Sequence, residues 1–241
     1  MKEKLTYLCR ALVVLATFAY YATIYIARLT RKDTLSAQEH VRHYCRQILR
    51  SAGQELRVEG ELPSAGDEPV VYVFDHGSML DAFVIGAMLT GKFTPAVAKE
   101  YMSWPLFGWI VKKHKCIAID RSNTGSAKES LLRLGMEAIR NGYSVVGFLE
   151  GTRTRTGFLQ KLKKGLLYLA ISAGVKIVPG HIEGNFQAAN RRDWRVQPGT
   201  IVVRIGCVIG TEGLSIDNPE DVNGLLESVR QELLRLGARE E

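Results

Sequence analysis

Residues 70–81 read Val70-Val71-Tyr72-Val73-Phe74-Asp75-His76-Gly77-Ser78-Met79-Leu80-Asp81. The first five residues are β-branched or aromatic, a composition typical of a buried strand. Gly77 and Ser78 interrupt that pattern, and residues 79–89 then read as a helix that Gly91 closes. His76 is therefore predicted to lie where a strand ends and a helix begins, which is where open α/β sheets place their chemistry.

His76 and Asp81 are five residues apart. On one continuous helix such a pair would lie on different faces. If His76 instead precedes the helix and Asp81 lies in its first turn, the carboxylate can reach back to the imidazole, as in a general base and the group that orients it. Taken alone, the pattern is equally compatible with a histidine at a strand end and an aspartate that favours a helix N-terminus.

The composition indicates a globular chain with an anionic partner. The 241 residues suit one domain with an appendage, and the 46% of hydrophobic residues are enough for a sizeable core. The formal net charge of +7 favours lipid headgroups, a phosphorylated substrate or nucleic acid as a partner. The four cysteines are scattered without a C-x-x-C pair, which is typical of reduced thiols in a protein that faces the cytosol.

Residues 11–27 contain no charge, and basic residues flank them on both sides. Seventeen residues reach roughly 25 Å as a helix, the lower limit for crossing a bilayer core. Three interpretations stay open: a short membrane span, a helix lying in one leaflet, and a buried helix of a soluble protein. The basic flanks are Lys2, Lys4 and Arg10 on one side and Arg28, Arg31 and Lys32 on the other.

Residues 36–53 read as a second, basic amphipathic helix. Its apolar face is formed by Val41, Tyr44, Ile48 and Leu49. Such a helix fits either a membrane-surface anchor or ordinary packing on the domain. The sequence thus predicts N-terminal membrane-anchoring helices over residues 1–53 and an α/β domain over residues 54–241.

Strand and helix patterns alternate through that domain. Apolar strands are predicted at residues 56–58, 70–74, 96–98, 116–119, 143–149, 175–179 and 201–209. Helices are predicted at residues 79–89, 126–140 and 162–173, and a final helix has Asn218 as its cap and Pro219 at its first position. The predicted fold class is α/β, with a mostly parallel or mixed central sheet flanked by helices and an N-terminal helical anchor.

Polar residues follow three of these strands, as His76 with Asp81, Asp120 with Arg121, and Glu150 with Arg153. If the strands are neighbours, one pocket holds a base, its carboxylate and two arginines. The planar fork of arginine binds two oxygens of a phosphate at once. Each arginine taken alone is more simply a solvated charge on a loop. The prediction of a phosphate-binding pocket therefore depends on all three polar strand ends occurring together.

Four blocks of the sequence, in the right order, resemble the glycerolipid acyltransferases, the family of 1-acyl-glycerol-3-phosphate acyltransferases. The likeness covers about residues 58–183. The family's N-H-x4-D block is similar to residues 75–81, and its strand followed by Asp-Arg is similar to residues 117–121. Its F-P-E-G-T-R block is similar to residues 148–153, and its apolar strand ending in proline is similar to residues 177–179.

The resemblance implies roles for these residues. His76 would deprotonate the free hydroxyl of a lysophospholipid, and Asp81 would fix the imidazole tautomer. The alkoxide would attack the thioester of acyl-CoA or acyl-ACP directly, with the backbone N–H groups near Gly77 or Ser78 as candidate donors to the oxyanion. The implied substrate-binding set is Arg121, Glu150, Gly151, Thr152, Arg153 and Lys99, with the two arginines on the acceptor's phosphate.

Two residues depart from the family pattern. Asp75 stands where the family usually has Asn, which predicts a second carboxylate beside the base and a shifted pH–rate profile. Leu149 replaces the usual proline before Glu150. Both lie in blocks that the family uses for acceptor binding, so the exact acceptor stays open.

The expected function is transfer of a fatty acyl group from acyl-CoA or acyl-ACP to the sn-2 hydroxyl of lysophosphatidic acid. The expected place is the inner (cytoplasmic) membrane with the site facing the cytosol, where the partners are the lysolipid, the anionic bilayer surface and the acyl donor. Two alternatives stay open. The acceptor is another lysophospholipid or a lyso-aminolipid, or the chain is a non-catalytic protein that binds anionic lipid. No metal cofactor is expected because no metal-ligand spacing occurs. No nucleic-acid partner is expected because the basic residues are not interleaved with stacking aromatics.

Overall fold

The computed structural model describes residues 2–28, 34–63, 68–104, 107–114, 116–121, 123–193 and 195–240. Within them, one seven-stranded sheet has the strand order β1-β7-β6-β2-β5-β3-β4. Neighbouring strands run parallel except for the antiparallel pair β6–β7. The predicted α/β class with a mixed sheet is confirmed. The strands are β1 (Gln54–Glu59), β2 (Val71–Phe74), β3 (Phe93–Ala98), β4 (Ile117–Ile119), β5 (Ser144–Phe148), β6 (Ile177–Glu183) and β7 (Gly199–Ile205).

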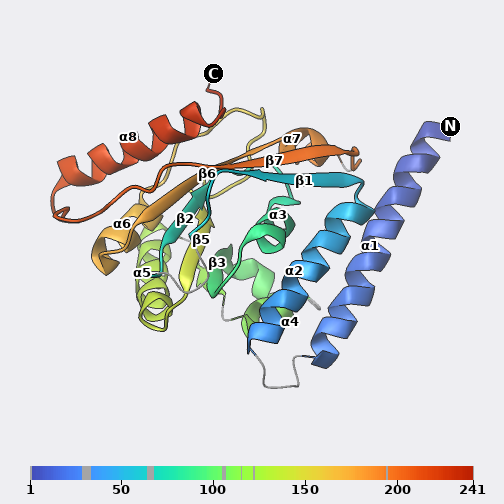
Figure 1. The fold of residues 1–241 in the computed structure, drawn as a ribbon, viewed down its shortest axis with the longest axis horizontal. Coiled ribbons are helices and arrows are strands. Elements are labelled where there is room, and N and C mark those ends of the chain that lie inside the picture. Colours follow the sequence, from blue (N-terminus) through green and yellow to red (C-terminus); the bar gives the residue numbers. More distant parts are fainter. Residues whose placement is uncertain are drawn as a thin grey trace.

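Helices cover both faces of the sheet (Figure 1). Helices α2 and α3 share one buried core with the sheet, and α5, α6 and α8 share a second core on the opposite face. The helical elements are α1 (Lys2–Arg28), α2 (Thr34–Ser51), α3 (Asp81–Met88), the 3₁₀-helix η1 (Lys99–Ser103), α4 (Phe107–Lys113), α5 (Thr124–Arg140), α6 (Gly165–Ala173), α7 (Asn185–Ala188) and α8 (Pro219–Arg235).

Strand β2 shows how the sheet separates the two cores. Tyr72 and Phe74 lie in the core with α2 and α3, whereas Val71 and Val73 lie in the core with α5, α6 and α8. All four side chains are buried, as expected for a central strand of a parallel sheet. Because successive side chains of an extended chain point to opposite faces, the next two residues, Asp75 and His76, are directed to different sides.

The carboxyl ends of five strands meet along one edge of the sheet. Strands β6, β2, β5, β3 and β4 are consecutive neighbours and all run parallel. The segments that follow them therefore lie side by side in that order. This edge of the sheet is where open α/β folds bind ligands.

Helix α1 is long and apolar enough to cross a membrane, judged by length and composition. Residues Thr6–Ile24 have a mean hydropathy of 1.5, and few of them are buried. This exposure disfavours the interpretation as a buried helix of a soluble protein. Among the α1 side chains that the structure describes, the large apolar ones that are exposed are Leu8, Leu12, Val13, Leu15 and Tyr20.

Helix α2 packs its apolar face on the domain. Tyr44, Ile48 and Leu49 are buried in the core that contains Tyr72 and Phe74. Figure 1 shows α1 lying alongside α2, and the Phe18 and Tyr44 rings join the two helices with centroids 6.0 Å apart. The structure thus supports ordinary packing for α2. A division of the chain at residue 53 stays a prediction.

Several element boundaries differ from the sequence prediction. Strand β6 continues to Glu183, past Pro179, which was predicted to end it. Pro179 pairs with Val73 of β2, but its carbonyl accepts from the Gly206 N–H on the β7 side at 2.8 Å. Because the β6–β7 ladder begins only at Gly180, the missing proline N–H falls at the end of that ladder, where it is tolerated. Strand β7 ends at Ile205, and Ile209 forms only an isolated bridge. The flanking residues Arg31 and Lys32 lie outside the described residues.

Candidate active site

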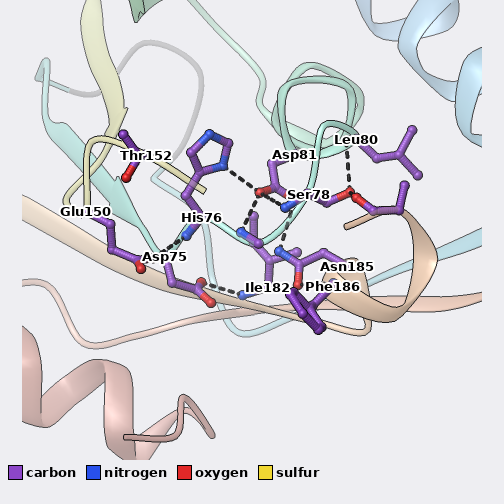
Figure 2. A network of polar contacts seen from close by, with 12 residues as sticks. Asp75, His76, Ser78, Leu80, Asp81, Glu150, Thr152, Ile182, Asn185 and Phe186 are labelled. Atoms are coloured by element: carbon purple, nitrogen blue, oxygen red, sulfur yellow. Dashed lines mark hydrogen bonds and ion pairs between the residues drawn. The ribbon is translucent and has the colours of Figure 1, made fainter. Parts of the chain in front are cut away.

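His76 and Asp81 form a close pair at the end of β2. The His76 Nδ1 atom lies 2.8 Å from Asp81 Oδ2, and Figure 2 shows the ring turned toward this carboxylate. Asp81 is the first residue of α3, so its carboxylate reaches back to the residue that follows the strand. When the Nδ1–H group donates to a carboxylate, the imidazole is in the tautomer whose free lone pair is on Nε2. The predicted arrangement of base and orienting carboxylate is therefore present.

The Asp81 carboxylate is fully buried and is held by three further donors. The backbone N–H groups of Gly77 and Ser78 each donate to Oδ2 at 2.9 Å, and Asn185 Nδ2 donates to Oδ1 at 3.0 Å. These bonds compensate for the burial of a charge and fix the carboxylate's orientation. The two N–H groups considered for an oxyanion are thus already bonded to Asp81.

A glycine at position 77 permits the approach of Asn185. A Cβ atom built on Gly77 would lie 2.8 Å from the Asn185 Oδ1 and 2.9 Å from its Nδ2. Asn185 opens the short helix α7 directly after β6, so the neighbouring strand delivers it to the pair. Sequence reasoning missed Asn185, which lies more than one hundred residues from Asp81 and outside the family blocks used in the prediction.

Glu150 fixes the backbone on the other side of His76. Its Oε1 accepts from the His76 N–H at 2.6 Å, and its Oε2 accepts from the Gln160 N–H at 3.0 Å and from Gln160 Nε2 at 2.9 Å. Glu150 is buried, and that burial raises the pKa of its carboxyl above the ordinary value. Glu150 therefore acts on the position of His76, which is a role that the sequence did not predict.

The His76 ring stacks on the Phe148 ring. Their centroids are 4.0 Å apart, and the planes differ by 11°. The His76 carbonyl accepts from the Thr154 N–H at 2.7 Å. The imidazole is thus held through its ring face, its Nδ1 atom and both backbone groups, while its side chain keeps 19% of its surface exposed. An oriented ring with an accessible Nε2 can take a proton from a bound hydroxyl.

Asp75 does not face the His76 ring. Its Oδ2 lies 3.0 Å from His181 Nδ1, and its Oδ1 accepts from the Ile182 N–H at 2.9 Å. Figure 2 shows this carboxylate directed away from the imidazole, toward β6. Asp75 adjoins His76 in the sequence, but its carboxylate bonds to β6 and not to the imidazole, because adjacent residues of an extended chain point to opposite faces. Asp75 instead joins the end of β2 to β6. The shifted pH–rate profile stays a prediction.

The substrate-binding candidates are spread along the sheet edge. Gly151 and Thr152 follow Glu150 at the end of β5, and partly buried Arg153 precedes Thr154, which bonds the His76 backbone. Gly151 has a φ of 71°, and a Cβ there would meet Lys163 Nζ at 2.8 Å, so the close neighbour of this glycine is a lysine side chain. The binding role of these residues stays a prediction.

Lys99 and Arg121 lie further along the same edge. Lys99 follows β3 and Arg121 follows β4, two and three strands from β2, or about 10 and 14 Å at the usual strand spacing. Lys99 Nζ forms an exposed ion pair with Asp120 Oδ2 at 3.1 Å, and Arg121 is exposed. The structure therefore places both residues on the β4 side of His76. Among the described residues, no cluster of three His, Cys, Asp or Glu side chains could hold a metal ion.

The family model described as Acyltransferase matches residues 55–183, which include His76, Asp81, Arg121 and Glu150. The chain belongs to this acyltransferase family. The resemblance noted in the sequence is thereby confirmed.

Several relatives of this chain have names that specify the acyltransferase reaction. Proteins named 1-acyl-sn-glycerol-3-phosphate acyltransferase from Cocos nucifera and Pseudomonas aeruginosa are 32% and 34% identical over 170 and 166 residues. These alignments cover 69% and 67% of this chain, and 54% and 62% of the relatives. The human 1-acyl-sn-glycerol-3-phosphate acyltransferase alpha is 30% identical over 76% of this chain and 63% of its own length. The chain thus spans a little more than half the length of the relatives it matches.

A solved structure has the same fold. The crystal structure of the 1-acyl-sn-glycerophosphate (LPA) acyltransferase PlsC from Thermotoga maritima superposes with a TM-score of 0.80. The match covers 99% of both chains at 22% sequence identity. The N-terminal helices and the mixed sheet of this acyltransferase family member therefore follow a known arrangement.

Proposed function

We propose that this chain transfers a fatty acyl group from a thioester donor, acyl-CoA or acyl-ACP, to the sn-2 hydroxyl of lysophosphatidic acid. The observation that carries the proposal is the His76 Nδ1 to Asp81 Oδ2 contact of 2.8 Å within a carboxylate site that three further donors fix. The names of the relatives support the acceptor. The product would be phosphatidic acid.

In the proposed reaction, His76 Nε2 accepts the proton of the lysolipid hydroxyl as its oxygen attacks the thioester carbonyl. Asp81 stabilises the imidazolium that forms, and it holds the tautomer that keeps Nε2 free. The C–O bond forms, the C–S bond breaks, and the proton passes from Nε2 to the leaving thiolate. No acyl-enzyme intermediate and no metal ion take part in this proposal.

The proposed place of the reaction is a membrane surface with the site on the cytosolic side. The exposed apolar side chains of α1 support insertion into lipid. The net charge of +7 supports attraction to anionic headgroups. An acyl acceptor that resides in the bilayer would then reach His76 without leaving the membrane surface.

The proposal is tested by following free thiol released from acyl-CoA by the purified 241-residue chain in detergent micelles. The acceptors are lysophosphatidic acid, lysophosphatidylcholine, a lyso-aminolipid and no acceptor. We expect release that depends on lysophosphatidic acid and exceeds release with the other acceptors. Preference for another lysolipid would support the proposed acyl transfer but show that lysophosphatidic acid is not the acceptor. Absence of acceptor-dependent release with both acyl-CoA and acyl-ACP would favour a non-catalytic lipid-binding protein.

A further inference from the structure

A basic pocket of about 710 Å³ lies beside the reaction centre. Its size suits a small-molecule ligand, because such pockets usually measure roughly 300–1,000 Å³. Three arginines line it, and no residue of the proposed mechanism does. The lining side chains include Arg155, Arg192, Arg195, Phe186, Asn190 and Asp193.

The pocket walls are continuous with the contacts that position His76 and Asp81. Arg155 directly follows Thr154, whose N–H donates to the His76 carbonyl at 2.7 Å. Phe186 directly follows Asn185, which donates to Asp81. The two walls also touch each other, because a Cβ on Gly157 would lie 3.1 Å from the Phe186 ring. The pocket is therefore formed by the segments that follow β5 and β6, the two neighbours of β2, and it adjoins the contacts that hold the catalytic pair.

The loop between α7 and β7 is held in place on the other side of the pocket. The Asn190 Oδ1 accepts from the N–H groups of Arg192 and Asp193 at 2.9 and 3.1 Å. Further along, Arg10 of α1 donates to the Val196 carbonyl at 3.1 Å. The arginines thus project from anchored backbone.

The charge of the pocket is not balanced internally. Arg195 is neutralised by Asp193, since Nε lies 2.9 and 2.8 Å from the two carboxylate oxygens. Hydrogen bonding to Arg195 lowers the pKa of the Asp193 carboxyl. Arg155 and Arg192 form no ion pair within the described part of the chain, and both are exposed. The lining therefore carries two uncompensated guanidinium groups, which suit phosphate oxygens.

We propose that this pocket binds the nucleotide phosphates of acyl-CoA. The inference rests on the proposed acyl transfer and names its donor. Two of the residues expected to face the acceptor, Arg121 and Lys99, lie on the β4 side of His76, away from this pocket. Arg153, the other arginine expected on the acceptor's phosphate, lies two residues before Arg155 and does not line the pocket. The flexible pantetheine arm separates the thioester of acyl-CoA from its phosphates, so a donor phosphate site has to lie outside the reaction centre. A nucleotide also fills more of the pocket's volume than the phosphomonoester headgroup of lysophosphatidic acid or phosphatidic acid does.

Steady-state kinetics of three variants test this assignment. Arg155→Gln and Arg192→Gln each remove one guanidinium from the pocket. Arg191→Gln removes an exposed neighbouring arginine that does not line it. We expect each pocket variant to raise the KM for acyl-CoA roughly tenfold, the usual weight of a charged hydrogen bond. The KM for lysophosphatidic acid should stay unchanged, as should both KM values of Arg191→Gln.

Two donors separate nucleotide recognition from other effects. Acyl-pantetheine lacks the nucleotide, so its KM should be the same in wild type and in both pocket variants. A rise in the KM for lysophosphatidic acid, or weaker binding to phosphatidic acid vesicles, would assign the pocket to a lipid headgroup and overturn the proposal. An unchanged KM for acyl-CoA, or turnover with acyl-ACP alone, would also overturn it.

Binding of adenosine 3′,5′-bisphosphate tests the site without turnover. This fragment of CoA should bind the wild-type chain in calorimetry, compete with acyl-CoA, and bind Arg155→Gln at least tenfold more weakly. The wild-type titration needs neither the lipid acceptor nor a variant that folds, and the Arg155→Gln titration assigns the binding to this pocket. Absence of binding to the wild type overturns the inference. Binding without acceptor-dependent thiol release would leave the site standing and remove the proposed acyl transfer.

Discussion

At the scale of single residues, the reaction centre depends on how a fully buried carboxylate is satisfied. Asp81 accepts from two backbone N–H groups, from Asn185 and from His76. Each donor offsets part of the cost of burying a charge, and together they leave the carboxylate one orientation. The imidazole direction is a consequence of that orientation.

Asn185→Ala should therefore lower the catalytic activity of His76 through Asp81, to which Asn185 donates a hydrogen bond. The variant leaves Asp81 Oδ1 without its amide donor, which costs about 1–3 kcal/mol of stability. We expect a kcat roughly tenfold lower with little change in KM, the lower end of the 10–100-fold cost of removing the hydrogen-bond partner of a metal-ligating residue, whose orientation is fixed in the same way. Asn223→Ala, at an exposed position of α8, is the matched control. A wild-type kcat for Asn185→Ala would show that this amide is dispensable.

Glu150→Gln should change how stability depends on pH. Burial raises the Glu150 pKa above its ordinary value of 4.5, so the folded protein holds this proton to a higher pH than the unfolded chain does. The carboxyl then contributes stability below the unfolded pKa, and that contribution is lost as pH rises through the folded pKa. Glutamine does not titrate, although it misplaces one hydrogen bond at a constant cost of about 1–3 kcal/mol.

The measurement is urea unfolding of the wild type and of Glu150→Gln between pH 4 and pH 7. The wild type's advantage in unfolding free energy should shrink as the pH rises above about 4.5, the ordinary value of the group. An advantage that is constant or grows over this range would mean that burial does not dominate at Glu150.

The local part of the site was predictable from the sequence, and the long-range part was not. His76 and Asp81 are five residues apart and lie on one strand–helix turn, so their contact follows from local geometry. Asn185 and His181 come from β6 and the turn after it, so their contacts with β2 appear only when the strand order is known. Gln160 is similarly hidden, because it reaches Glu150 through an irregular loop.

At the scale of elements, α2 and α3 pack closely at Gly86. A Cβ atom on this glycine would lie 2.5 Å from the Cys45 Sγ. Both residues are buried, and burial raises the pKa of the Cys45 thiol to about 12. This contact joins the N-terminal helices to the helix that carries Asp81.

Gly86→Ala should destabilise the protein despite the better helix propensity of alanine. Overpacking costs about 1–3 kcal/mol, against a propensity gain of about 1 kcal/mol. In a Cys45→Ala background the sulfur is absent, so most of the added penalty should disappear. Gly224→Ala in α8 is the control, because no atom lies within 4 Å of its added methyl group.

Thermal or urea unfolding of the four Gly86 and Cys45 combinations measures the coupling directly. Equal penalties for Gly86→Ala in both backgrounds would show that the contact with Cys45 does not limit the approach of α2 to α3.

Element types were predicted well where a hydrophobic pattern had clear stops. The helix capped by Asn218 is an example, since its side chain accepts from the Glu220 N–H as a cap should. Strand ends were predicted less well. Pro179 reads as a stop, but it lies where β6 changes its pairing, and this change of partner has no local signature.

At the scale of the whole molecule, the strand order brings the residues of the active site together, and α1 exposes apolar side chains that can contact lipid. Leu12 and Leu15 are 56% and 62% exposed, so they are available to a bilayer. The double variant Leu12→Asp/Leu15→Asp should move the protein from the membrane to the soluble fraction, since an aspartate at the centre of a span costs about 2.5–3.5 kcal/mol. Val208→Asp, at an apolar position 51% exposed in the segment after β7, is the control. Unchanged sedimentation of the double variant with vesicles would exclude α1 as the anchor.

In the proposed reaction, the Asp81-oriented imidazole of His76 is the base in acyl transfer to a lysolipid. The most direct test compares thiol release that depends on lysophosphatidic acid in wild type, His76→Ala and His43→Ala, the last at an exposed histidine of α2. We expect a loss of about 10²–10⁴-fold for His76→Ala alone, with vesicle binding retained. A His76→Ala rate equal to that of the wild type would contradict this expectation.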